Sequence, residues 1–274
     1  MSDFDRNVAA AQYGRPLTGA EAAVVDAGLR AYMLRIYNYM VLGLAITGFA
    51  ALGAYMVAVT GDAASAGRVM QRGSEVAAQI RPGVFLTPIG VALYASPLKW
   101  VIMLAPLALV FFFSFRAESM RPATAQITFW GFAALIGLSL SVIFLVYTHT
   151  SIVRVFFITA ASFGALSLWG YTTQRDISAW GSFLLMGLFG IIIAMLVNIF
   201  LQSSAMQWTI SVIGVLVFAG LTAWDTQRLK TDYLDSAMEG EVLERSAIMG
   251  ALSLYLNFIN MFTFLLQLFG QREE

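Results

Sequence analysis

The sequence contains a series of long, continuous apolar stretches, and these constrain the fold more than any other feature. An α-helix needs about 20 mostly apolar residues to cross the hydrocarbon core of a bilayer. Strands of a membrane barrel would instead alternate apolar and polar residues over about 10 positions. The predicted spans cover residues 33–59, 100–115, 123–147, 152–171, 179–201, 206–224 and 247–269. We therefore predict an all-α integral membrane protein with seven transmembrane helices.

Composition supports lipid as the solvent of this chain. Charged residues make up 12% of the 274 residues and hydrophobic residues 59%, whereas a soluble domain carries about 25% charged residues. The formal net charge is zero, which argues against nucleic acid as a partner. The chain has no cysteine, so disulfides, thiolate chemistry and cysteine metal sites are excluded.

Two regions and an orientation follow from the distribution of charge. Residues 1–32 are polar and lack the apolar core of a signal peptide, so we predict a cytosolic N-terminal tail followed by a transmembrane domain over residues 33–270. The apolar piece 84–95 is too short to span. With the N-terminus inside, ten basic residues face the cytosol and six the other side. The positive-inside rule then predicts a cytosolic N-terminus and an outside C-terminus.

The motifs of common intramembrane enzymes are missing from the sequence. The only histidine is His149, and no metal-binding histidine pair, nucleophile elbow or phosphate-binding glycine loop occurs. We therefore expect a protein that is not an enzyme, with no catalytic residues and no cofactor.

Ionisable groups within or at the ends of membrane helices are costly, which makes them functional candidates. Asp225 is predicted at the end of the sixth span, either as a functional carboxylate or as an interfacial one paired with Arg228, three residues on. Arg116 closes the second span, either as a functional cation or as an anchor that extends to the headgroups. The acidic loop predicted over residues 232–244 is either a solvated face or a vestibule that attracts cations.

The last span carries a polar stripe. Ser253, Asn257 and Asn260 are separated by steps of four and three, and Gln267 continues the same face. Two interpretations remain open, a packing seam between helices and the lining of a polar path. In both cases we expect Asn257 and Asn260 to be shielded from lipid, and Phe258 or Phe262 less so.

Two segments of this region resemble a known family. The stretches Ala223-Trp-Asp-Thr-Gln-Arg-Leu-Lys230 and Leu254-Tyr-Leu-Asn-Phe-Ile-Asn260 resemble the Bax-inhibitor-like family, the transmembrane Bax inhibitor motif group, in its bacterial inner-membrane branch. The resemblance implies six helices wrapped around a central seventh, in a bacterial cytoplasmic membrane. It also implies a pH-sensitive calcium leak with an aspartate pair as sensor. Asp225 matches the first aspartate, and Arg116 matches a basic latch from the second helix.

The sequence departs from the family pattern at Asn257, where the family has the second aspartate. Two close carboxylates share a proton and titrate as a coupled pair, whereas an asparagine cannot ionise. Calcium accepts both carboxylate and amide oxygens, so the resemblance implies a weak calcium site at Asp225 and Asn257. The expected partners are the lipid bilayer, calcium ions and other membrane proteins.

These observations predict a passive, pH-modulated calcium leak. The alternative is a non-conducting regulator of membrane-protein quality control or stress survival. An intramembrane enzyme is a third hypothesis, which the missing motifs disfavour.

Overall fold

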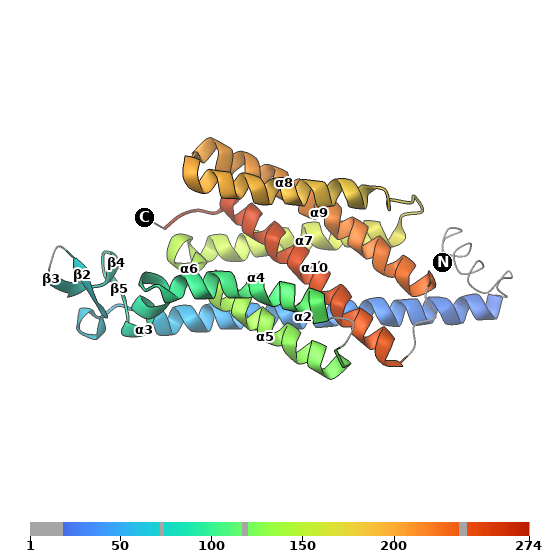
Figure 1. Cartoon of the computed structure of the whole chain (residues 1–274), viewed down its shortest axis with the longest axis horizontal. Coiled ribbons are helices and arrows are strands. Elements are labelled where there is room, and N and C mark those ends of the chain that lie inside the picture. Colours follow the sequence, from blue (N-terminus) through green and yellow to red (C-terminus); the bar gives the residue numbers. More distant parts are fainter. Residues whose placement is uncertain (1–18, 72–73, 117–119, 236–239, 274) are drawn as a thin grey trace. The chain divides into compact units, whose positions relative to one another are not determined.

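The computed structural model describes residues 19–71, 74–116, 120–235 and 240–273, and this part of the chain is mostly helical (Figure 1). The longer helices are α2 (Gly19–Ala58), α4 (Leu98–Arg116), α5 (Pro122–Leu140), α7 (His149–Thr172), α8 (Trp180–Leu201), α9 (Ser204–Asp235) and α10 (Gly240–Phe269). Between α2 and α4 lie the strands β1 (Val59–Thr60), β2 (Arg68–Gln71), β3 (Ser74–Ala77), β4 (Gln79–Arg81) and β5 (Val84–Leu86).

Among the described residues, six helices are long and apolar enough to cross a membrane. A seventh span is present if the short helical piece Pro88–Ala95 and the first part of α4, Leu98–Val110, count as one span broken by a 62° bend. The structure therefore gives six to seven candidate spans among the described residues. This agrees with the predicted integral membrane protein, while the count of exactly seven stays a prediction.

The chain divides into two compact units, of which the first holds the start of α2, to Val41, together with most of α7 and all of α8, α9 and α10. Glycines allow its helices to approach closely. A Cβ on Gly170 of α7 would lie 2.3 Å from the carbonyl oxygen of Ala223 in α9, and one on Gly181 of α8 would lie 2.4 Å from the ring of Trp224. Small residues at helix crossings are typical of membrane bundles, where van der Waals packing drives association.

The close approach at Gly170 gives a testable prediction for stability. Gly170→Ala should lower the free energy of unfolding by about 1–3 kcal/mol, because the new methyl group meets backbone that cannot rotate away. The matched control is Gly190→Ala in α8, where a Cβ has no atom within 4 Å. Thermal unfolding of both proteins in the same detergent measures the difference. Equal midpoints for the two variants would mean that α7 and α9 do not cross at Gly170.

The second unit comprises residues 42–149 and 271–274 and contains the strands, which the sequence analysis did not predict. One sheet has the order β1-β5-β4, and β2 pairs with β3 in a separate antiparallel ribbon. Gly83 closes the turn between β4 and β5 with a φ of 75°. A type II turn requires such a positive φ at its third residue, and proline, here Pro82, is common at the residue before it. The predicted apolar piece 84–95 is split: β5 uses its first residues, and α3 (Pro88–Gly90) and the π-helical turn η2 (Val91–Ala95) use the rest.

Two helix boundaries differ from the sequence prediction by more than ten residues. Helix α2 begins at Gly19, so residues 19–32 of the predicted tail are helical, and residues 1–18 lie outside the described part of the chain. Helix α9 continues ten residues beyond Asp225, to Asp235. It continues because Leu229, Lys230 and Leu234 are buried by the protein itself. The acidic residues assigned to a loop therefore lie mostly at the ends of α9 and α10, and Glu239 lies outside the described residues.

Candidate functional site

A buried carboxylate between α9 and α10 is the centre of the candidate site. Asp225 of α9 is only 4% exposed. Its Oδ2 accepts a hydrogen bond of 2.7 Å from Nδ2 of Asn257 and one of 2.9 Å from Oγ of Ser253, both from α10. Because a carboxylate without partners would be very costly in an apolar interior, these donors explain how α9 can carry an acid at this depth.

The charge of Asp225 is balanced by Arg228, one turn further along α9. Nη2 of Arg228 lies 3.0 Å from Oδ1 of Asp225, and its side chain is 41% exposed. The guanidinium also lies over the Trp224 ring, 4.8 Å from the ring centroid. The local ion pair that was one of the two interpretations of Asp225 is therefore present. It leaves one side of the pair accessible from outside the protein.

The polar stripe of α10 faces α9 for part of its length. Ser253 and Asn257 contact Asp225, whereas Asn260 is half-buried and donates to the Leu256 carbonyl of its own helix. The expectation of a more exposed Phe258 is wrong: Phe258 is buried to the same extent as Asn257, as is Phe262 one turn further on. Aromatic rings of α7 explain this, because Phe156 lies edge-on to both phenylalanines.

The remaining member of the stripe, Gln267, belongs to a second polar cluster. Its Oε1 accepts hydrogen bonds from Nε2 of Gln207 at 2.7 Å and from Oγ of Ser211 at 2.8 Å. Gln207 in turn accepts from Nδ2 of Asn198 in α8. Between the two clusters, the rings of Phe218 and Phe264 lie 6.0 Å apart. The seam between α9 and α10 is therefore polar near both ends and aromatic in between.

Arg116, the predicted latch, is exposed at the end of α4 in the second unit, whereas Asp225 belongs to the first. The latch between them stays a prediction. The predicted weak calcium site at Asp225 and Asn257 also stays a prediction. In this conformation Asp225 is surrounded by hydrogen-bond donors, and the described residues contain no group of three or more histidines or acids that could hold a metal ion.

Two buried polar residues of α9 were missed as site candidates. Lys230 is 1% exposed, and its Nζ donates a 3.0 Å hydrogen bond to the Tyr171 carbonyl in the last turn of α7, where a cation also complements the helix dipole. Gln227 accepts from the Ile177 N–H and donates to the Arg175 carbonyl, both at 2.8 Å. The only sequence signal was their polarity beside an apolar span.

The loop that Gln227 holds, between α7 and α8, has its own internal support. Oδ1 of Asp176 accepts a 2.8 Å hydrogen bond from the Ser178 N–H. Hydrogen bonds from the Ser178 side chain and then from its backbone lower the pKa of Asp176. Asp176 is therefore an exposed, ionised loop carboxylate, in contrast to the buried Asp225.

The third missed feature is a chain of hydroxyl groups across three helices. The Tyr37 hydroxyl of α2 lies 2.6 Å from Oγ of Ser167 in α7, which lies 2.9 Å from Oγ1 of Thr226 in α9. Thr226 then donates to the Thr222 carbonyl of its own helix. The two ends of this chain are 189 positions apart in the sequence, from Tyr37 to Thr226, so no local pattern could have joined them.

Comparison with known proteins identifies the family. The model of the family described as "Inhibitor of apoptosis-promoting Bax1" matches residues 29–274. This chain belongs to that family. The resemblance seen around Asp225 and Asn257 is thereby confirmed at the level of the family, over nearly the whole chain.

Relatives in this family cover the chain almost end to end. Inner membrane protein YbhL of Escherichia coli strain K12 is 40% identical over 248 residues, which are 90% of this chain and 94% of YbhL. A protein of Caulobacter vibrioides is 40% identical over 275 residues and covers 100% of both chains. Protein RP147 of Rickettsia prowazekii is 41% identical over 257 residues, which are 94% of this chain and 96% of RP147. The six to seven apolar helices and this family membership together make the chain an integral membrane protein.

Proposed function

We propose that this protein is a passive calcium leak whose ion path follows the seam between α9 and α10, with Asp225 as the cation-binding carboxylate. The observation that carries the proposal is the burial of Asp225 within a candidate membrane span. A buried acid in a membrane helix is expensive and therefore marks an ion pathway by default. The activity that the Bax-inhibitor-like resemblance implies agrees with this position.

A central position for α10 is part of the proposal. In the most apolar stretch of α10, 72% of the residues are buried. In the corresponding stretches of the other five long candidate spans, at most 39% are buried. A helix surrounded by six others would have this profile, because it has no lipid-facing side. The polar groups of α10 would then line a path through the protein.

The structure corresponds to a closed form in this proposal. Calcium requires oxygen ligands at about 2.3–2.6 Å. The carboxylate oxygens of Asp225 are already engaged, because they accept hydrogen bonds from Ser253 and Asn257 and form an ion pair with Arg228. Opening requires Arg228 to leave and the Asn257 amide to turn its oxygen toward the ion. With one carboxylate, binding stays weak, which suits passage through the membrane, and modulation by pH is reduced relative to an aspartate pair.

Calcium entry into dye-loaded liposomes that contain the purified protein tests the proposal. We expect entry above that of empty liposomes, and a loss of about tenfold in Asp225→Asn, which corresponds to about 1.4 kcal/mol of cation binding. The matched control is Asp176→Asn, which neutralises the exposed loop carboxylate and should leave entry unchanged. Folded protein without calcium entry, or equal entry in both variants, would reject the leak. The first of these results would favour the non-conducting regulator of membrane-protein quality control or stress survival. Neither role is enzymatic.

The proposed location is a bacterial inner membrane, with the N-terminus on the cytosolic side and the C-terminus outside. The α7–α8 loop at Thr173 and the start of α10 at Gly240 should then face the cytosol, and the tight turn at Ser203 the outside. Reporter fusions at these three positions measure the orientation. The fusion at Ser203 is decisive. A cytosolic signal there would mean that the predicted orientation or the predicted number of spans is wrong.

A further inference from the structure

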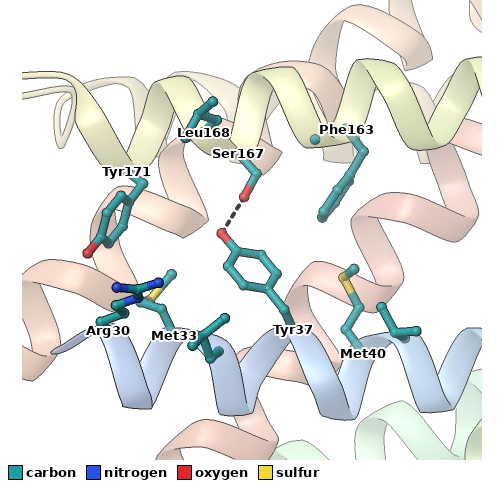
Figure 2. Close-up of a pocket in the computed structure, with 11 residues that line it drawn as sticks. Arg30, Met33, Tyr37, Met40, Phe163, Ser167, Leu168 and Tyr171 are labelled. Carbon is teal, nitrogen blue, oxygen red and sulfur yellow. Dashed lines mark hydrogen bonds between the residues drawn. The ribbon is translucent and has the colours of Figure 1, made fainter. Parts of the chain in front are cut away.

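A groove runs along the first unit between α2 and α7, and its volume is about 450 Å³. Figure 2 shows side chains of the two helices facing one another across it. Both helices are candidate membrane spans, so the groove lies at the depth of the bilayer. Its walls are mainly apolar and are formed by Met33, Leu34, Met40, Val41, Phe163 and Leu168.

The length of the groove matches one leaflet. On α2 it extends from Arg30 to Val41, and at about 1.5 Å per residue these eleven steps cover about 16 Å. The hydrocarbon core of a bilayer is about 30 Å thick. An acyl chain that lies along the groove would therefore end near the middle of the membrane.

One end of the groove is polar and cationic. Figure 2 shows Arg30 and Tyr171 at the same end, on opposite sides of the groove. Arg30 is exposed and precedes the apolar part of α2, and Tyr171 lies in the last turn of α7, so both belong to the membrane–water interface. Arg30 is the charged residue of the lining, and no lining residue is acidic. A guanidinium at this position favours a phosphate.

The interior of the groove favours an acyl chain over a polar ligand or a polypeptide. The Tyr37 and Ser167 hydroxyls, which lie in its middle, are hydrogen-bonded to one another at 2.6 Å (Figure 2), so they do not require a polar ligand. A partner helix is about 10 Å wide with its side chains, which is too large for a groove of about 450 Å³ over this length.

We propose that this groove binds one acyl chain of an anionic phospholipid, whose phosphate lies against Arg30 and Tyr171. The inference goes beyond the calcium leak, and it holds whether or not the protein conducts ions. It also gives the Tyr37–Ser167–Thr226 hydroxyl chain a position directly behind a bound lipid.

Native mass spectrometry of the purified full-length protein tests the proposal, with phosphatidylglycerol and phosphatidylcholine titrated separately. Arg30→Gln should weaken phosphatidylglycerol binding about fivefold, the effect of one interfacial arginine, and leave phosphatidylcholine binding nearly unchanged. Gly164→Leu should weaken both about tenfold by filling the groove. A Cβ on Gly164 meets no atom within 4 Å, so this variant should fold.

Two variants serve as matched controls for these effects. Arg35→Gln removes an exposed charge from the same end of α2, and Gly190→Leu adds the same side chain to α8, where a Cβ also meets nothing within 4 Å. Neither residue lines the groove. Both controls should bind the two lipids as the unmodified protein does, and inorganic phosphate should not displace phosphatidylglycerol.

A phospholipid with a photoreactive acyl chain locates the bound molecule. Cross-links should map to residues 33–41 and 163–168, and Gly164→Leu should strongly reduce them. The proposal is overturned if the cross-links lie elsewhere, or if Arg30→Gln and Gly164→Leu bind lipid like their controls. It is also overturned if Gly164→Leu converts a dimer to a monomer without changing lipid binding, because the groove would then be an interface between two copies.

Discussion

Replacing Asn257 with aspartate should make calcium entry strongly dependent on pH. The change removes the hydrogen bond that Nδ2 of Asn257 donates to Asp225 at 2.7 Å and places a second carboxylate at nearly the same distance. Two carboxylates this close cannot both ionise without a large penalty, so the pair keeps a shared proton to a higher pH than an isolated carboxyl would. Arg228 is the nearest cation in the described site and offsets the charge of only one of them.

The direction of the effect follows from this shared proton. At acidic pH the shared proton bridges the two carboxylates and the seam stays closed. As the pH rises over the range of the measurement the proton leaves, and the repulsion separates α9 from α10. Calcium entry should therefore rise, and the stability of the variant should fall, with increasing pH. The unmodified chain, which has one carboxylate here, should vary little over the same range.

Three proteins serve as controls for the measurement of calcium entry into liposomes across pH. The double variant Asn257→Asp, Asp225→Asn should be flat again, because only one carboxylate remains. Asn260→Asp adds an acid to the same stripe, but Asn260 bonds to Leu256 of its own helix, so no coupled pair forms and the profile should stay flat. Asp225→Asn alone completes the series. Steep pH dependence in the unmodified chain that survives Asp225→Asn would place the sensor elsewhere, with the acidic residues between 232 and 244 as the next candidates.

Removing the guanidinium of Arg228 should have the second largest effect. It should raise calcium entry and lower the stability of the protein. Arg228→Gln leaves Oδ1 of Asp225 without its cation, so calcium should reach the carboxylate more easily and entry should rise. The free energy of unfolding should fall by about 1.5–3 kcal/mol, the contribution of a hydrogen bond to a charged group. The fall should stay below the 3–5 kcal/mol of a fully buried pair, because 41% of the Arg228 side chain is exposed.

The same measurement on Arg116→Gln decides between two latches. If Arg116 holds Asp225 in the closed form, as the family resemblance implies, Arg116→Gln should raise calcium entry at least as much as Arg228→Gln does. If Arg228 alone closes the site, only Arg228→Gln should raise it. Arg228→Lys keeps the charge but lacks the planar fork of a guanidinium, so it should restore part of the closed behaviour. Unchanged entry in all three variants would mean that neither arginine controls access to Asp225.

The sequence alone determined the features of this protein that depend on local pattern. Apolar runs of about 20 residues predicted the membrane helices because burying a backbone in lipid requires a helix of that length. The spacing of Ser253 and Asn257 placed both on one face of α10, and the three-residue separation of Asp225 and Arg228 made their ion pair one of the two interpretations of Asp225. All of these relations act within one helix or one span, where the geometry follows from 3.6 residues per turn.

Other features were decided only by the tertiary structure. Helix α9 continues past its apolar stretch because other parts of the protein bury Lys230 and Leu234, and Phe258 is shielded because α7 supplies aromatic partners. The groove beside Tyr37 exists because α2 and α7, more than 100 positions apart in the sequence, lie side by side. A single sequence specifies how apolar each helix face is, but which neighbour covers that face depends on the packing of all the helices together. The donors that surround Asp225, and with them the chemistry of the site, arise at that level.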